Sequence, residues 1–135
     1  MGLDEFGQCG DGTSYHIKGV TRVVLADDIV IKKICCGRYH SLLLTSEGDV
    51  YSFGDNDCGQ LGRHCDDFNG SIATKIESSV KFIDIYSRCD QNICIALSES
   101  QKCFVWGKCG EEEVRIPRET QFDSINETIL IKANK

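Results

Sequence analysis

The sequence repeats itself, and this repeat limits the folds that the chain can adopt. Residues 1–10 match residues 53–62 at an offset of 52, with one glycine and a Gly-Gln-x-Gly motif in register and Asp4 opposite Asn56. An offset of 53 aligns residues 50–54 with residues 103–107. A period near 50 residues is typical of propellers and solenoids, in which similar units stack on one another. The chain is therefore expected to be an array of such units.

Each unit is expected to contain four strands, because short segments rich in Val, Ile, Leu and aromatic residues recur between the glycine motifs. In the first unit these predicted strands are Val20–Leu25, Ile29–Cys36, Ser41–Thr45 and Val50–Phe53. In the second unit they are Ile72–Ile76, Val80–Tyr86, Cys94–Leu97 and Cys103–Trp106. The stretch Ser46–Asp49 is predicted to be a hairpin turn that contains a glycine. Near the end of the chain, Phe122–Ile125 and Ile129–Ala133 resemble the opening strands of a further unit.

The repeat predicts an all-β chain whose blades are four-stranded antiparallel sheets, within one repeat region over residues 1–135. The end of a preceding blade is expected at 1–19, blades at 20–71 and 72–120, and the start of a further blade at 121–135. A closed propeller has at least about four blades, whereas this chain holds about two full blades and two partial ones. We therefore expect an incomplete ring and a fragment of a larger protein, whose open strand edges favour self-association.

The residues of one unit resemble a known repeat. Ile34–Thr45, followed by Gly48–Asn56 and Gly59–Gly62, is similar to the repeat of the regulator of chromosome condensation family. The resemblance implies four-stranded blades, roughly seven of which close a β-propeller in complete members. Some members carry a BTB domain after the propeller. It also implies that certain residues define the repeat structurally, with Gly37 and His40 holding strand ends together. With the turn glycines and core aromatics, the predicted set is Gly37, His40, Ser41, Gly48, Gly54, Asn56, Gly59, Gln60, Gly62, Trp106 and Gly107.

The second unit departs from this pattern in its loops. Cys89–Ile93 replaces Gly37–His40, and Lys108–Glu113 replaces the Gly-Gln-Leu-Gly turn. We expect the loops of this unit to have a different shape, so the roles of the family's residues are not carried onto them. Glu111–Glu113 is predicted to be a solvated loop, with contact to a basic partner as the alternative.

Charge argues against several classes of partner. The net charge is −6, both halves of the chain hold more acidic than basic residues, and the only clustered bases are Lys32 and Lys33. Nucleic acids and anionic lipids are therefore poor candidates, and an unidentified protein is the expected partner. The sequence has neither a secretory signal nor an apolar run of roughly 18 residues, so we expect a protein of the cytoplasm or nucleus with nine reduced cysteines and no membrane contact.

The sequence contains no pattern that predicts chemistry. His40 and Ser41 are neighbours on a strand and point to opposite faces, and no acidic residue is placed to orient the imidazole. Gly54, Gly59 and Gly62 form turns and not a phosphate loop, because no helix or Lys-Ser follows them. The cysteines lack C-x-x-C spacing, so no zinc site is expected, and Cys35, Cys94 and Cys103 are predicted to be small buried hydrophobic residues. His16 and His64 are expected on the surface. No catalytic, cofactor-binding or metal-binding residue is predicted.

Three functions follow from these observations. The leading hypothesis is a non-catalytic protein–protein interaction scaffold, as part of a larger regulatory or ubiquitin-ligase adaptor protein. The alternative is guanine-nucleotide exchange on a small GTPase, which the resemblance implies because the founding family member acts on Ran. A third hypothesis, metal or redox sensing, rests only on the cysteine count.

Overall fold

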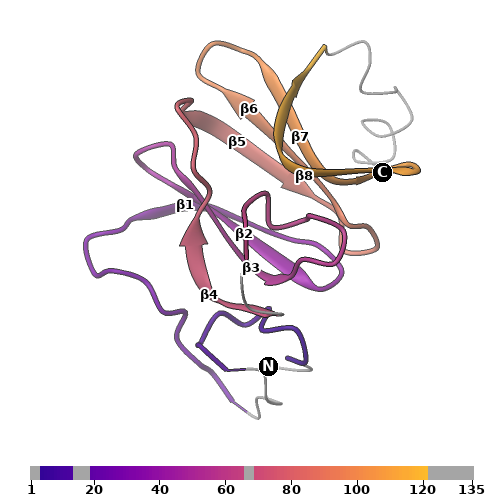
Figure 1. The fold of residues 1–135 in the computed structure, drawn as a ribbon. Coiled ribbons are helices and arrows are strands. Elements are labelled where there is room, and N and C mark those ends of the chain that lie inside the picture. The colour runs from indigo at the N-terminus through magenta and orange to yellow at the C-terminus, as the bar shows by residue number, and fades with distance from the viewer. Residues whose placement is uncertain (1–3, 14–18, 66–68, 122–135) are drawn as a thin grey trace.

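The computed structural model describes residues 4–13, 19–65 and 69–121, which form two four-stranded antiparallel sheets (Figure 1). The first sheet has the order β1 (Ile31–Cys36), β2 (His40–Thr45), β3 (Val50–Asp55) and β4 (Asn69–Lys75). The second has the order β5 (Phe82–Ser87), β6 (Ile93–Ser98), β7 (Cys103–Cys109) and β8 (Glu112–Thr120). The predicted all-β class and the four-stranded antiparallel sheets are thereby confirmed. None of the described residues belongs to a helix long and apolar enough to cross a membrane.

The strand prediction is wrong at the start of the first sheet. Residues 20–25 form no strand, and Asn69–Lys75 is the fourth strand instead, with Tyr51 of β3 opposite Lys75. The predicted strand Ile72–Ile76 therefore completes the first sheet and does not open the second. The segment 20–25 is apolar because Val23 and Leu25 pack over the outer face of the first sheet, next to Phe53. Apolar composition indicates burial of this kind as readily as it indicates strand pairing.

The strand β8 is missing from the prediction. It pairs with β7, with Cys109 opposite Glu112 and Gly107 opposite Val114. Charged residues fill five of its nine positions, and only Val114 is buried, so the sequence lacks the apolar pattern that marks a strand. Glu111–Glu113 accordingly belongs to a β-hairpin and not to a loop. The predicted strands Phe122–Ile125 and Ile129–Ala133 lie outside the described residues, and the division into blades at 1–19, 20–71, 72–120 and 121–135 stays a prediction.

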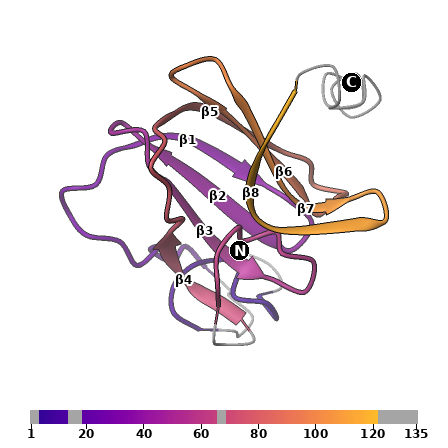
Figure 2. The same ribbon diagram turned by 45° about the horizontal axis from the view of Figure 1, so that its top comes forward.

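The core lies between the two sheets, which are side by side in both ribbon views (Figures 1 and 2). Leu42 and Leu44 of β2 face the second sheet, whereas Leu43 faces the opposite side and packs against Phe53. This alternation is the two-residue period of a strand. The second sheet adds Trp106 and Ile85, both almost completely buried. Each buried aliphatic side chain contributes about 1.5–3 kcal/mol, so both faces of β2 stabilise the fold.

Several aliphatic side chains remain exposed on the edge strands or beside them. Val30 and Ile34 are each 62% exposed at β1, and Ile83 is 36% exposed on β5. An edge strand with exposed aliphatic residues can pair with another chain. This composition supports self-association, which stays a prediction.

The hairpin turns of the two sheets have the same hydrogen bonds but different residues. After β2, the amide of Gly48 donates to the Thr45 carbonyl at 3.1 Å, and the amide of Asp49 donates to Thr45 Oγ1 at 3.1 Å. After β6, the amide of Gln101 donates to the Ser98 carbonyl, and that of Lys102 donates to Ser98 Oγ, both at 3.0 Å. The turn requires a positive φ, which is 82° at Gly48 and 64° at Gln101. Gln101 is thus a non-glycine residue whose backbone has the left-handed conformation that favours glycine.

We expect Gln101→Gly to stabilise the protein. Relief of the left-handed backbone is worth about 1–2 kcal/mol, and the greater freedom of glycine in the unfolded chain offsets about half of it. The free energy of unfolding should therefore rise by about 0.5–1 kcal/mol in urea titrations. The matched reverse change, Gly48→Gln, should lower it, because a Cβ there would lie 3.0 Å from Lys81 Cβ and 3.1 Å from the Phe82 carbonyl oxygen. A neutral or destabilising Gln101→Gly would contradict the role assigned to this turn.

Candidate functional site

The two sheets are joined by the turn that follows β3, residues 55–62, here called the inter-sheet turn. Its side chains bind its own backbone: Asn56 Oδ1 accepts from the Leu61 amide at 3.1 Å, and Gln60 Oε1 accepts from the Cys58 amide at 2.9 Å. Gln60 is fully buried, and its Nε2 donates to Asp55 Oδ2 at 2.7 Å. Two of the repeat-defining residues predicted for this segment, Asn56 and Gln60, therefore stabilise one conformation of its backbone.

The inter-sheet turn fits against the second sheet. The Gln60 carbonyl oxygen accepts a hydrogen bond from Trp106 Nε1 at 3.0 Å and another from the Cys94 thiol at 3.3 Å. A Cβ on Gly62 would lie 2.9 Å from the Trp106 indole, and one on Gly59 would lie 2.8 Å from Arg115 Cα. Both glycines also have positive φ values, 76° and 64° for Gly59 and Gly62. Only glycine therefore allows the turn to approach β7 and β8 this closely.

The first sheet carries the same arrangement on its other side. Asp4 Oδ1 accepts from the Cys9 amide at 2.8 Å, as Asn56 does five residues before Leu61. The carbonyl oxygen of Gln8 accepts from Ser41 Oγ at 3.0 Å, and a Cβ on Gly10 would lie 2.7 Å from the Phe53 ring. Residues 4–10 thus pack on the first sheet as residues 56–62 pack on the second, and the sequence repeat is a repeat of contacts.

His40 forms a second link between the sheets. Its Nε2 lies 3.1 Å from Ser87 Oγ and 3.1 Å from Cys94 Sγ. Ser87 Oγ donates to the Ile93 carbonyl at 3.0 Å and the Cys94 thiol donates to Gln60, so both atoms are left to accept from His40. The imidazole is therefore neutral with its proton on Nε2. Burial lowers the pKa of His40 to about 4, and Nδ1 has no hydrogen-bond partner among the described residues.

Glycines make room for these contacts at the strand ends. A Cβ on Gly37 would lie 1.8 Å from His40 Cε1, so any side chain there would displace the imidazole. Gly54 and Gly107 lie at matching places in the two sheets, where a Cβ would come within 2.4 Å of the Tyr39 carbonyl oxygen and 2.0 Å of the Asn92 carbonyl oxygen. These positions explain why the sequence repeats glycine here.

The geometry separates His40 from Ser41. His40 hydrogen bonds toward the second sheet, whereas Ser41 Oγ donates to Gln8 on the opposite face of β2. No three His, Cys, Asp or Glu side chains of the described residues gather in a way that could hold a metal ion. Cys94 and Cys103 are buried, as expected, and Cys35 is partly buried. Cys94 and Cys35 are also hydrogen-bond donors, because the Cys35 thiol lies 3.3 Å from the Ile85 carbonyl oxygen.

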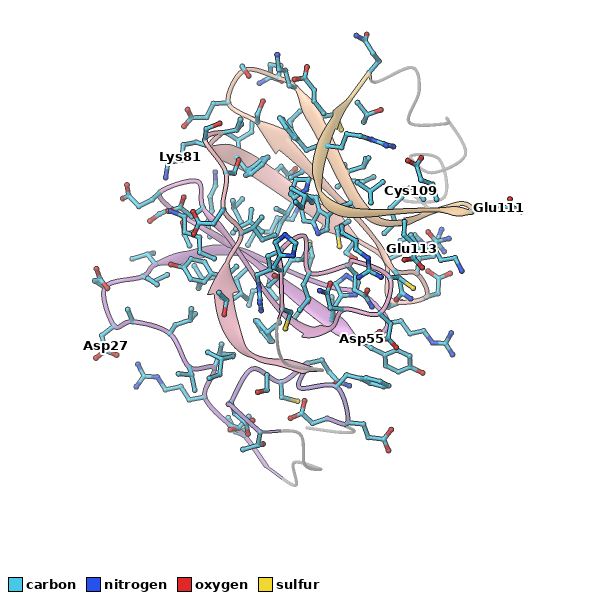
Figure 3. All side chains as sticks on the ribbon, in the orientation of Figure 1. Asp27, Asp55, Lys81, Cys109, Glu111 and Glu113 are labelled. Atoms are coloured by element: carbon cyan, nitrogen blue, oxygen red, sulfur yellow. The ribbon has the colours of Figure 1, made fainter. Side chains whose placement is uncertain are left out.

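The acidic segment at the tip of the β7–β8 hairpin is mostly paired. Glu111 is exposed and points away from the sheets, whereas Glu113 lies nearer the body of the protein (Figure 3). Glu113 pairs with Arg115 at 3.0 Å and Glu112 with Arg118 at 2.7 Å, and the Arg118 guanidinium lowers the pKa of Glu112. Of the two histidines expected on the surface, His64 is exposed, and His16 lies outside the described residues.

We expect His40 to make the stability of the protein depend on pH. The imidazole binds a proton at about pH 6.5 in the unfolded chain and about 4 in the folded protein, so stability is lost as the pH falls through this window. Between pH 7 and pH 5, the free energy of unfolding should fall by about 2 kcal/mol more than in a His40→Gln variant. Urea titrations at both pH values measure the difference. His64→Gln is the control and should keep the full slope; an equal slope in His40→Gln would refute the assignment.

The family model and the curated relatives that match this chain all point to the same repeat family. A model described as the regulator of chromosome condensation (RCC1) repeat matches residues 31–60. The guanine nucleotide exchange factor SRM1 of Saccharomyces cerevisiae is 30% identical over 123 residues, which are 78% of this chain and 25% of that protein. The X-linked retinitis pigmentosa GTPase regulator of Homo sapiens is 30% identical over 132 residues, 96% of this chain and 12% of that protein. The chain thus spans a quarter or less of the length of these curated relatives.

Solved structures show the fold. Yeast RCC1 (Prp20), in its complex with Kap60, superposes with a TM-score of 0.77 at 23% identity, over 91% of this chain and 32% of that one. Human WBSCR16 superposes with a TM-score of 0.72 at 27% identity, over 90% of this chain and 34% of that one. The neighbours are RCC1 β-propellers, so the two sheets are blades of that fold and the predicted propeller class is confirmed.

Proposed function

The chain is built from regulator of chromosome condensation repeats, and from that premise we propose that it is a non-catalytic scaffold that binds another protein through the loops of its blades. The observation that carries the proposal is the use of the buried polar side chains. His40, Gln60, Ser87 and Cys94 are all engaged in hydrogen bonds that join one part of the fold to another. His40, Gln60 and Cys94 are also almost completely buried, so a substrate cannot reach them, and burial disfavours both the imidazolium of His40 and the thiolate of Cys94 by lowering the pKa of the first and raising that of the second.

The relatives support binding to proteins. One solved neighbour is yeast RCC1 bound to Kap60, and the description of another, Prp20p, reports its binding properties to Gsp1p and histones. We propose that this chain also binds a protein, because its net charge of −6 argues against nucleic acid as the partner. We propose the cytoplasm or nucleus as the place where it does so.

Guanine-nucleotide exchange is the second candidate. It is favoured by the 30% identity to the exchange factor SRM1 over 78% of this chain. The two candidates differ in one measurable quantity, because a scaffold leaves the rate of GDP release from a GTPase unchanged whereas an exchange factor raises it.

We expect the 135-residue chain to leave GDP release at the intrinsic rate, within about twofold. Release of a fluorescent GDP from a small GTPase of the Ran class measures this, with yeast SRM1 as the positive control. A dose-dependent acceleration that is lost on heating the protein would establish the exchange function instead.

A partner recovered by crosslinking should, once purified, bind equally well to the Cys36→Ser and Cys89→Ser variants, since a scaffold needs neither exposed thiol. Loss of binding in either variant would contradict thiol-independent scaffolding.

A further inference from the structure

A cleft lies between the edge strands of the two sheets. Its volume is about 340 Å³, within the range of about 300–1,000 Å³ that ligand-binding clefts usually have. The segment after β3 lies between β4 and β8 in both ribbon views (Figures 1 and 2). Gly62, the last residue of the inter-sheet turn, and the next two residues, Arg63 and His64, line the cleft. Thr74, Lys75 and Glu77 line one wall, in and after β4, and Ile116 of β8 lines the other.

Arg63 is a partly buried cation in this cleft. Its Nε donates to Ser52 Oγ at 3.1 Å and its Nη2 donates to the Ser52 carbonyl at 3.0 Å, next to the irregularity in the β3–β4 ladder. The described residues place no carboxylate within 4.0 Å of the guanidinium. Burial lowers the pKa of Arg63, and a hydrogen bond with the Cys65 side chain opposes this effect only in part. A buried charge is normally paired, and a guanidinium has five N–H donors, so Arg63 can accept a further anionic partner.

Lys75 adds positive charge to the same cleft. Its Nζ lies 3.2 Å from Asp49 Oδ1, but Lys81 Nζ lies 2.6 Å from the same oxygen. One carboxylate thus faces two ammonium groups, and Glu47 and Glu99 add negative charge near Lys81, so Asp49 neutralises Lys75 only in part. The acidic Glu77 also lines the cleft, but Arg63 and Lys75 outnumber it. The lining is therefore positive in a chain whose net charge is −6, and because charges are screened over about 8 Å, these near charges decide what binds.

The opposite wall is apolar. Ile116 is 55% exposed although it faces a cleft, flanked on β8 by Arg115 and Pro117. A ligand that fits both walls must present a negative charge to one wall and an aliphatic group to the other. An extended peptide with an acidic residue next to an aliphatic one can do this, because successive side chains point to opposite sides of the peptide.

We propose that the cleft binds an acidic, aliphatic peptide segment of a protein partner, with a carboxylate on Arg63 and Lys75 and a neighbouring aliphatic side chain on Ile116. The carboxylate forms charge-assisted hydrogen bonds with the guanidinium, and the aliphatic group covers Ile116. This inference rests on the proposed scaffold function, for which it names a binding site and the chemistry of the partner.

The test uses three fluorescein-labelled peptides of equal length. One alternates Glu and Leu, the second has Lys in place of every Glu, and the third has Ser in place of every Leu. Fluorescence anisotropy with the 135-residue chain should show binding of the first peptide, at least tenfold weaker binding of the other two, and weakening with added salt.

Two variants locate the site, and two matched variants control for charge and apolar surface. Lys75→Glu and Ile116→Ser should each weaken binding of the Glu-Leu peptide by at least tenfold. Lys32→Glu and Ile34→Ser change exposed residues of the same kinds on β1, away from the cleft, and should leave binding within twofold. Circular dichroism verifies that all four variants fold, and Lys75→Gln replaces Lys75→Glu if the latter does not.

Three results would overturn the proposal: no binding of the Glu-Leu peptide at millimolar concentration, equal binding of the Lys-Leu peptide, or unchanged binding in both cleft variants. None of these results would decide whether the chain is a scaffold, because that function is tested separately with the purified partner. Partner binding that survives Lys75→Glu and Ile116→Ser would place the partner elsewhere on the blades and refute this site alone.

Discussion

The carbonyl oxygen of Gln60 is the point on which the arrangement of the two sheets depends. Trp106 and Cys94 of the second sheet both donate to it, and all three residues are fully buried. A buried polar group left without a partner costs about 1–3 kcal/mol, so a sheet that slid or tilted away would lose both bonds at once. The turn can present this oxygen because Asn56 and the Gln60 side chain fix its backbone, and because Gly62 leaves room for the indole.

The candidate binding site follows from the same turn. Residue 62 contacts the Trp106 ring, and the next residue, Arg63, reaches back to Ser52 of the first sheet and lines the cleft between β4 and β8. The cleft exists because the turn holds the sheets together at the core while their edge strands diverge. Fold and proposed function are thus linked through two neighbouring residues, Gly62 for the docking of the sheets and Arg63 for the charge of the cleft.

The sequence predicts those features that need a special residue and misses those that do not. Gly59, Gln60 and Gly62 recur in register because few residues can form this turn, so the all-β repeat could be predicted. The strand β8 could not be predicted, because most of its residues are charged and it lacks an apolar pattern. Residues 20–25 have the composition of a strand, but they only pack over the outer face of the first sheet. Ser87 and Arg63 have no repeated signal, since Asp11 stands at the position that matches Arg63. Cys94 had one: it aligns with Ser41, which donates to Gln8 as Cys94 donates to Gln60.

The inter-sheet turn makes the two sheets one cooperative unit. Trp106 is the only tryptophan, so its fluorescence reports the junction, while circular dichroism reports both sheets. The two probes should therefore give coincident urea transitions. Gly62→Ala, whose Cβ would lie 2.9 Å from the indole, should lower both midpoints together by an amount equivalent to about 2 kcal/mol. Separate transitions in the unsubstituted protein, or a shift of the fluorescence midpoint alone in Gly62→Ala, would contradict this cooperativity.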